Sequence, residues 1–385
     1  MWKRLAATRL GRLSREFPAV LIIGARQVGK TTLARQTWPR LPYCDLENPN
    51  MTAMFREDPV FQIESRLNRG IVLDEAQAVP DLFAALRGII DRKTTRTQRI
   101  VLLGSANPLL LRQVSETLAG RVGILELDPL VAEEAGAGSP RRTWKHVWLR
   151  GGFPRALRGA FRDWWEAYLR TYVERDLRAL GVETDPLLMR RLLTMLAHMQ
   201  GGLLNSSQLS NSLGVSHNTV RRYLDILEYT FLIRRLPPYF TNVGKRLTKS
   251  PKVYIRDTGL LHHLLNISSP AELESHPIRG ASWETFVIED ILRREKVRHP
   301  FSQAYFWRTQ AGAEVDLVID RGSERIGLEV KTGAGQSAAA AKRLAESLGD
   351  FGASHGYVLD QSAGADALAP GIRRIGYPDH LTWLP

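Results

Sequence analysis

The stretch Gly24-Ala-Arg-Gln-Val-Gly29-Lys30-Thr31 decides the first fold prediction, because it fits the pattern G-x-x-x-x-G-K-[ST] in full. The run LII precedes it as an expected strand, and TTLARQTW follows it as the start of an expected helix. Glycines are needed where the backbone curls its N–H groups around phosphate oxygens and a Cβ would clash. The sequence therefore predicts a loop that binds the phosphates of ATP or a close NTP relative.

The residue types in this loop predict separate roles. We expect Lys30 to reach the β- and γ-phosphates and the Thr31 hydroxyl to ligate Mg²⁺. The N-terminus of the following helix should add partial positive charge. The residues expected to contact the nucleotide are Gly24, Ala25, Arg26, Gln27, Val28, Gly29, Lys30, Thr31 and Thr32.

Two adjacent carboxylates end the apolar run Ile71-Val-Leu-Asp74-Glu75. After a phosphate-binding loop, Asp74 is placed to hold the Mg²⁺ shell and Glu75 to polarise an attacking water. The adjacent glutamate favours hydrolysis over binding alone.

Two further segments supply candidate catalytic groups. Ser105 and Asn107 follow the apolar run Ile100 to Leu103, where polar groups could sense the γ-phosphate or position water. Arg121 could stabilise transition-state charge in its own site or in that of a neighbour. The alternatives are an Asn turn and a surface arginine. Oligomeric state stays open, since a monomer and a homo-oligomer would carry the same arginine.

Short apolar runs alternate with amphipathic stretches in residues 1–142. The runs are Ala19 to Ile23, Gly70 to Leu73, Ile100 to Leu103 and Gly123 to Leu127. Each has the length of a strand and is nearly all apolar, as expected for strands buried on both faces of a parallel sheet. With helical patterns between them, they predict an α/β fold.

The combination of motifs resembles a known family. RQVGKTTL, LDEAQ, GSAN, LAGR, GGFP (151–154), YVERDL (172–177) and KSPKVYIRDTGL (249–260) look like the prokaryotic AAA+-type P-loop ATPases whose C-terminal region carries a domain of unknown function. The resemblance covers nearly the whole chain and implies a second half similar to PD-(D/E)XK nuclease folds. Ala106 departs from the pattern, because many relatives carry a hydroxyl there. Ser105 and Asn107 are then the sensor candidates.

Residues 206–227 have the pattern of a helix-turn-helix. Ser206 or Ser207 can cap the first helix, Gly214 supplies the turn and Ser216 caps the second helix. Strand-like segments at 231–236 and 252–255 complete a winged-helix pattern. The expected DNA contacts are His217, Asn218, Arg221, Arg222, Lys245 and Arg246. The alternative is a winged helix that serves only in packing or oligomerisation.

The last third carries a D…E-x-K pattern. Asp316 begins one expected strand, and Glu329 and Lys331 share a face of another, because side chains two apart on a strand point the same way. With Glu284 from a helix, these carboxylates could hold Mg²⁺ while Lys331 activates water. Arg308, beside Trp307, could contact phosphate or form a cation–π pair. Active nuclease and inactive scaffold both remain open.

Charge and composition limit the class of protein. The net charge of +13 favours contact with DNA or another polyanion, although solvated arginine faces would give the same value. Cys44 is the single cysteine, which suits a reducing compartment. Residues 1–17 lack an apolar core typical of a secretory signal, and no apolar run approaches the roughly 18 residues of a membrane span. We expect a cytoplasmic protein without a membrane partner.

These observations predict four segments. They are a P-loop ATPase core at 1–142, a helical linker or lid at 143–200, a winged helix at 201–256 and a restriction-endonuclease-like α/β domain at 257–385. The predicted function is ATP hydrolysis directed at DNA or a DNA-associated complex, with metal-dependent nuclease activity as an open addition. The alternatives are a nucleotide-gated protein-interaction switch without nuclease activity, and a DNA-binding regulator with slow ATPase.

Overall fold

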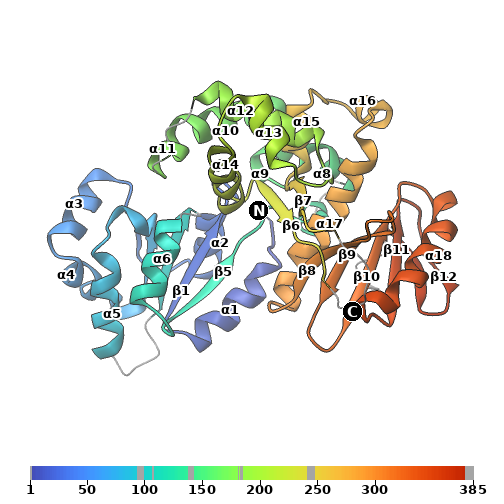
Figure 1. Cartoon of the computed structure of the whole chain (residues 1–385). Helices are drawn as coiled ribbons and strands as arrows, with labels where there is room; N and C mark the ends of the chain where they lie inside the picture. Colours follow the sequence, from blue (N-terminus) through green and yellow to red (C-terminus); the bar gives the residue numbers. More distant parts are fainter. Residues whose placement is uncertain are drawn as a thin grey trace. The chain divides into compact units, whose positions relative to one another are not determined.

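The computed structural model describes residues 2–92, 99–105, 108–137, 143–180, 182, 185–240 and 248–377 of the 385-residue chain (Figure 1). Its contacts divide the chain into two compact units. The first comprises Met1–Leu130 with Phe153–Arg155 and Tyr229–Phe231, and the second comprises Val131–Gly152, Ala156–Glu228 and Leu232–Pro385. The last three predicted segments thus group mainly into one unit, and the first unit ends before the predicted boundary at 142.

A five-stranded sheet forms the centre of the first unit. Its strands are β1 (Ala19–Gly24), β2 (Tyr43–Asp45), β3 (Ile71–Asp74), β4 (Ile100–Ser105) and β5 (Val122–Glu126). They lie in the order β2-β3-β4-β1-β5 and every pair is parallel. The predicted α/β fold and its four apolar strands are confirmed. The short strand β2 was not predicted.

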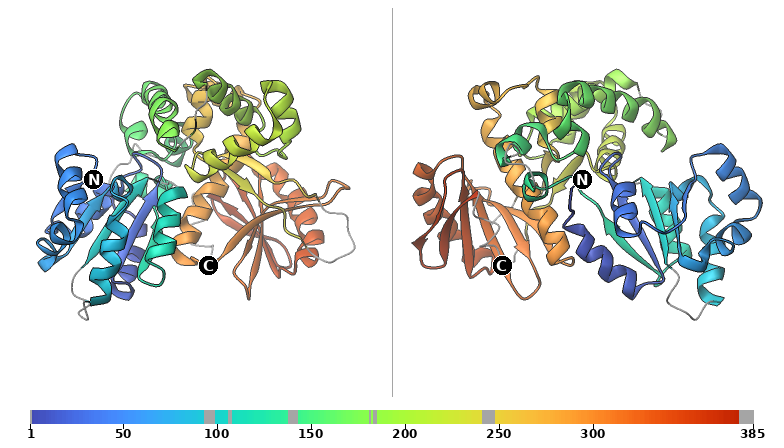
Figure 2. Two further views of the ribbon diagram at one scale, coloured as in Figure 1. Left: turned by 60° about the vertical axis from the view of Figure 1, so that its left-hand side comes forward. Right: turned by 180° about the vertical axis from the view of Figure 1, so that it is seen from behind.

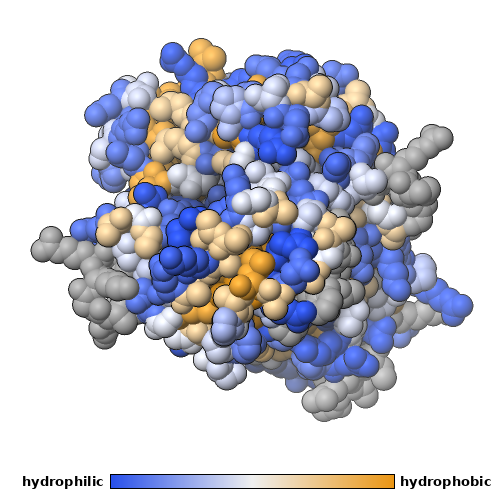
Figure 3. Space-filling model, turned by 90° about the vertical axis from the view of Figure 1, so that its right-hand side faces the viewer, coloured by the Kyte–Doolittle hydropathy of each residue, from blue (hydrophilic) through white to orange (hydrophobic). Residues whose placement is uncertain are grey.

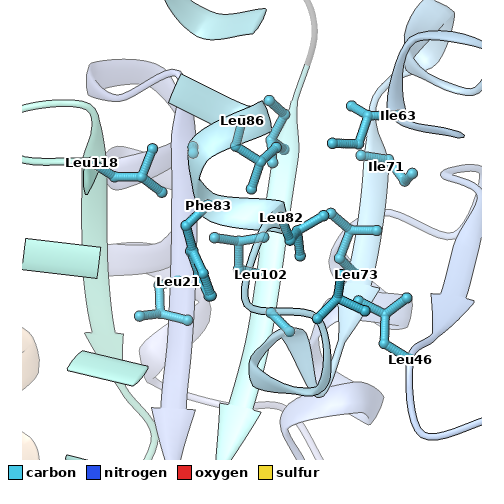
Figure 4. Close-up of a cluster of buried hydrophobic side chains, with 14 of the residues drawn as sticks. Leu21, Leu46, Ile63, Ile71, Leu73, Leu82, Phe83, Leu86, Leu102 and Leu118 are labelled. Atoms are coloured by element: carbon cyan, nitrogen blue, oxygen red, sulfur yellow. The ribbon is translucent and has the colours of Figure 1, made fainter. Parts of the chain in front are cut away.

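Helices cover both faces of this sheet. They are α1 (Ala6–Glu16), α2 (Lys30–Thr37), α3 (Pro49–Glu57), α4 (Pro59–Glu64), α5 (Leu82–Arg92) and α6 (Pro108–Thr117). On one face, Leu21 and Leu102 pack against Phe83 and Leu86 of α5 in a buried cluster (Figure 4). On the other face, the α1 side chain of Leu13 lies beside Gly123, where a Cβ would come within 3.1 Å of it.

Helices dominate the part of the chain after Leu130, most of which belongs to the second unit. They are α7 (Ala132–Gly136), α8 (Trp144–Arg150), α9 (Pro154–Arg158), α10 (Phe161–Thr171), a π-helical turn (Tyr172–Asp176), α11 (Leu177–Ala179), α12 (Pro186–His198), α13 (Ser206–Leu213) and α14 (His217–Tyr229). The antiparallel pair β6 (Ile233–Leu236) and β7 (Lys252–Ile255) follows, with α15 (Thr258–Leu264), α16 (Pro270–Ser275) and α17 (Arg279–Arg298) after it.

A six-stranded mixed sheet completes the second unit. Its strands are β8 (Gln303–Arg308), β9 (Glu314–Asp320), β10 (Arg325–Val330), β11 (His355–Asp360), β12 (Ala365–Ala369) and β13 (Ile372–Gly376), in the order β12-β13-β11-β10-β9-β8. Helix α18 (Ser337–Leu348) packs on it through Leu344, against Val318 and Val358. Figure 2 shows this sheet and its helix from two further sides.

Figure 3 shows the hydropathy of the side chains on one face of the surface. The face drawn in Figure 3 carries mostly hydrophilic side chains, with hydrophobic ones in small patches. Among the residues that the structure describes, no helix combines the length and apolar character needed to cross a bilayer.

Candidate functional site

The phosphate-binding loop joins β1 to α2 and has the backbone of an anion cradle. Gln27 and Gly29 have positive φ values of 60° and 106°, so successive N–H groups turn toward one side of the loop. Gly29 caps α2 and has no side chain to accept the N–H groups of the first turn. These donors and the helix N-terminus suit a phosphate group.

Two cations hold the loop in place. The Lys30 ammonium donates to the carbonyl oxygens of Gly24 and Ala25, both at 3.0 Å. The buried Arg4 guanidinium donates to the carbonyl oxygens of Val28 (3.2 Å) and Asp128 (2.5 Å). Lys30 is therefore poised at the predicted position, bound to carbonyl groups that a phosphate could replace as its partner.

The predicted magnesium-binding residues meet at the carboxyl edge of the sheet. The Thr31 hydroxyl donates to Asp74 Oδ2 at 2.7 Å, and the Tyr43 hydroxyl donates to the same oxygen at 2.6 Å. Burial, and then the hydrogen bond to Asp74, raise the pKa of Tyr43 well above its usual value. Thr31 and Asp74 are thus close enough to share one Mg²⁺ shell, and their oxygen donors fit this ion.

Glu75 adopts the left-handed backbone conformation, with φ 52° and ψ 49°. That conformation is costly for a residue with a side chain and is common at functional sites. The Gln77 amide donates to Glu75 Oε2 at 2.5 Å, and the Ser105 hydroxyl lies 3.4 Å from Oε1. Glu75 is thereby oriented beside the end of β4. Ala106 and Asn107 lie outside the described residues.

The structure does not bring Arg121 to this edge. Its carbonyl accepts from the Ala19 N–H at 3.2 Å, and Val122 pairs with Ala19 at the amino end of β1. The length of β1 from Ala19 to Gly24, about 17 Å, separates that end from the phosphate-binding loop. The guanidinium forms a bidentate ion pair with Asp91, at 2.6 and 3.0 Å. The expectation that Arg121 acts in its own site is therefore wrong; a role in a neighbour's site stays a prediction.

The second predicted constellation forms two helices and a hairpin. Asn205, rather than Ser206 or Ser207, caps α13, because its side chain accepts from the Gln208 N–H at 3.0 Å. Gly214 has the left-handed conformation of a helix end, and Ser216 accepts from the Thr219 N–H at 3.1 Å. The exposed side chains of α14 include His217, Asn218, Arg221 and Arg222. Lys245 and Arg246 lie outside the described residues, and the winged-helix identity stays a prediction.

The carboxylates of the C-terminal domain lie close to lysine side chains. Asp316 Oδ2 accepts from the Val330 N–H at 2.8 Å, and Glu329 Oε1 lies 2.7 Å from the Lys331 ammonium. The Lys252 ammonium lies 3.3 Å from Glu284 Oε1. Within the part of the chain that the structure describes, no group of three or more His, Cys, Asp or Glu is arranged to hold a metal ion. The predicted metal set is therefore not assembled as one.

Positively charged side chains lie beside the carboxylates that would have to bind the metal ion. Lys252 Nζ also lies 2.5 Å from Glu314 Oε1 and 3.7 Å from Asp316 Oδ1. Arg308 forms an ion pair with Glu314 at 3.2 Å. Burial, and then the Asp316 charge, raise the pKa of Glu329 to about 7.

Sequence reasoning missed four residues of these sites. Arg4 and Tyr43 lie far along the chain from the groups they bind, and no local pattern marks them. Gln77 and Lys252 stand inside the quoted LDEAQ and KSPKVYIRDTGL segments. Those segments carried a signal for a site, but nothing in them showed which carboxylate each residue would meet.

Three models of known protein families match consecutive parts of the chain. The model of an AAA domain matches residues 16–136. Models of two domains of unknown function, DUF8612 and DUF4143, match residues 141–271 and 279–378. The uncharacterized proteins Rv2008c of Mycobacterium tuberculosis and Mb2031c of Mycobacterium bovis are each 44% identical over 335 residues, which covers 86% of this chain and 74% of theirs.

Solved structures give more distant similarities. The Walker-type ATPase PABY2304 of Pyrococcus abyssi is 16% identical with a TM-score of 0.46, over 69% of this chain and 96% of that one. The ORC1 protein of Aeropyrum pernix, solved in complex with DNA, is 14% identical with a TM-score of 0.33, over 69% of this chain and 93% of that one.

Proposed function

We propose that this chain, which belongs to the family of the mycobacterial proteins Rv2008c and Mb2031c, binds ATP with Mg²⁺ and hydrolyses it. The match of residues 16–136 to an AAA domain supports the proposal. The observation that carries the proposal is the 2.7 Å hydrogen bond from Thr31 to Asp74. This contact places the predicted metal-binding groups of two separate motifs side by side, at the end of the phosphate-binding loop.

Each group of residues has a proposed role that follows from its position in the site. The loop N–H groups and Lys30 bind the β- and γ-phosphates, and Thr31 and Asp74 hold Mg²⁺. When bound, Mg²⁺ neutralises charge on these phosphates. Glu75 accepts a hydrogen bond from the attacking water and orients it in line with the γ-phosphate. Gln77 keeps the Glu75 side chain directed to that place, through the 2.5 Å hydrogen bond.

Nucleotide binding tests the first half of the proposal. Lys30→Ala should weaken ATP binding by at least about tenfold, because an ammonium that pairs with phosphate contributes more than 1.4 kcal/mol. Lys3→Ala is the matched control, since Lys3 is exposed and lies outside the loop. Isothermal titration with ATP and Mg²⁺ measures both. Equal affinity of Lys30→Ala and the wild type would contradict the assignment of the loop.

We also propose that the ATPase acts on DNA or a DNA-associated complex through α14. The support is the exposed polar and basic side chains of His217, Asn218, Arg221 and Arg222, together with the net charge of +13. The alternative is a nucleotide-gated switch directed at a protein. Metal-dependent cleavage is not part of this proposal, because Lys252 lies among the carboxylates that would perform it.

A further inference from the structure

A buried lysine lies where a nuclease of the resembled type would need its metal. Lys252 projects from β7 toward three carboxylates, and its side chain is 2% exposed. The three are Glu284 of α17 and Glu314 and Asp316 of β9; Glu329 of β10 contacts Lys331, as Asp316 does.

The Lys252 ammonium lies between three carboxylates, two of them within hydrogen-bond distance and the third in an ion pair. Nζ lies 2.5 Å from Glu314 Oε1, 3.3 Å from Glu284 Oε1 and 3.7 Å from Asp316 Oδ1. An ammonium has three donors, and three carboxylates surround this one. Burial alone would lower the pKa of Lys252, but these carboxylates outweigh it and raise the pKa above its ordinary value. The three carboxylates therefore favour the charged form of the lysine.

The lysine is also fixed at its backbone, and its buried ammonium lies beside an aromatic ring. Lys252 pairs with Leu236 in the β6–β7 hairpin and forms a second bridge with Leu203. Its ammonium lies 5.6 Å from the centre of the Phe306 ring. To leave the cluster, the side chain would have to abandon buried carboxylates, and each unpaired buried charge costs several kcal/mol.

Other oxygens of the cluster have partners of their own, but Glu329 Oε2 is buried and has no hydrogen-bond partner among the described residues. Asp316 Oδ2 accepts from the Val330 N–H, and Glu329 Oε1 pairs with Lys331. Glu284 Oε1 also accepts from the Tyr254 hydroxyl at 2.7 Å. A divalent ion must approach several oxygens to about 2.0–2.6 Å, at the place where the Lys252 ammonium lies. The metal implied by the nuclease resemblance does not fit these residues.

We propose that Lys252 is the resident cation of this cluster, that it makes the C-terminal domain inert to Mg²⁺ and Mn²⁺, and that its removal uncovers a divalent-cation site. The proposal does not depend on ATP hydrolysis by the first unit. With the ammonium gone, Glu284, Glu314 and Asp316 lose their shared partner at once. Three converging carboxylates without a cation are the hard oxygen ligands that Mn²⁺ and Mg²⁺ select.

The experiment is a Mn²⁺ titration of the full chain, followed by electron paramagnetic resonance of the free ion. All proteins carry Thr31→Ala and contain no nucleotide, so that the phosphate-binding loop adds no metal. The protein that retains Lys252 should show no saturable Mn²⁺ site up to about 1 mM. The Lys252→Met protein should show one site with a dissociation constant at least tenfold below that concentration. Adding Asp316→Asn to Lys252→Met should remove that site. Lys342→Met, an exposed lysine, is the matched control.

Two results would overturn the proposal. One is a Mn²⁺ site in the protein that retains Lys252 and that Asp316→Asn removes. The other is a folded Lys252→Met protein that binds no Mn²⁺. If Lys252→Met is too unstable to purify, the comparison of the lysine-containing protein with and without Asp316→Asn decides, because a metal site sensitive to Asp316 contradicts a resident lysine and its absence supports one.

Discussion

At the residue scale, Tyr43 is a positioning residue for the proposed magnesium site. Its hydroxyl and that of Thr31 donate to the same oxygen of Asp74, and the Arg35 guanidinium lies 4.1 Å from the centre of its ring. Tyr43→Phe should raise the Mg²⁺ concentration for half-maximal ATP hydrolysis about tenfold, because partners of metal ligands orient them. Affinity for ATP without Mg²⁺ should stay unchanged.

Tyr229→Phe is the control for this prediction, because Tyr229 is half exposed and lies outside the site. A Tyr43→Phe protein with the Mg²⁺ dependence of the wild type would show that the hydroxyl does not position Asp74. A loss of ATP affinity without Mg²⁺ would indicate a general disturbance of the loop instead.

His262 makes a second prediction at this scale. It is fully buried, and its ring nitrogens lie 2.8 Å from the Leu149 carbonyl oxygen and 2.7 Å from the Ser282 hydroxyl oxygen. Burial lowers the pKa of His262 to about 4, from 6.5. The neutral ring therefore contributes stability above pH 6.5, and this contribution is lost as the pH falls from 6.5 to 4.

The measurement is urea unfolding of the wild type and His262→Gln across that pH range. The difference in free energy of unfolding between the two should shrink by about 3 kcal/mol toward pH 4, since one pKa unit corresponds to about 1.4 kcal/mol. Other titrating groups cancel in the difference. His217→Gln, at an exposed position, is the control substitution. A constant difference for His262→Gln would mean that its ring is not held neutral.

The sequence predicted the site residues that belong to contiguous motifs. Lys30, Thr31 and Asp74 could be assigned because the spacing of each motif fixes its own local geometry. Tyr43 and Lys252 could not, because the pairing of strands and the packing of the hairpin bring them to their carboxylates. Arg121 was misplaced for the same reason, since only the strand register shows at which end of the sheet it lies.

At the element scale, Asp257 connects the segment 151–154 to the segment 249–260 by hydrogen bonds. Its carboxylate accepts from the Gly152 N–H at 2.8 Å and from the Gly259 N–H at 2.9 Å, at the start of α15. Gly151 has a φ of 81°, and a Cβ there would lie 1.7 Å from Asp257 Oδ1. Gly151→Ala should therefore lower the free energy of unfolding by more than about 3 kcal/mol.

Gly280→Ala is the matched substitution, because Gly280 lies within α17 and a Cβ there would meet nothing within 4 Å. Chemical denaturation should show no loss for it, and a gain of up to about 1 kcal/mol, since alanine favours the helix. Equal stability of the two variants would mean that the loop of Gly151 can move away from Asp257.

Among the strands of the first sheet, those with long apolar runs could be predicted from the sequence and the shortest one could not. The four predicted strands of the first sheet are apolar runs bounded by turn signals. The strand β2 has three residues, Tyr43–Asp45, and its register with β3 rather than its sequence makes it a strand. The cap at Asn205 was missed by one residue, because the next two residues are serines, which cap helices equally well.

At the scale of the whole molecule, the positive charge makes a prediction about DNA. Binding to double-stranded DNA should weaken steeply with salt, and Arg221→Ala with Arg222→Ala should weaken it about tenfold or more at about 0.1 M salt. Lys342→Ala with Arg343→Ala removes two exposed cations from α18 and serves as control. Fluorescence anisotropy measures both. Equal losses would indicate general charge attraction, and no loss in either would favour the protein-directed switch.

The division into units was the least predictable feature of the chain. The boundary at residue 142 stays a prediction of the sequence. The contacts end the first unit at Leu130 and also assign Phe153–Arg155 and Tyr229–Phe231 to it. Such assignments depend on tertiary packing between distant segments, and no local pattern encodes them.

The measurement that tests the central claim most directly is steady-state hydrolysis of ATP with Mg²⁺ by the wild type and Glu75→Gln. The substitution keeps the shape of the side chain and its place beside Gln77 and Ser105, but removes the charge that we propose polarises water. We predict hydrolysis by the wild type, and a rate at least about a hundredfold lower in the variant with ATP affinity unchanged. Hydrolysis at the same rate by both proteins, or by neither, would contradict the account.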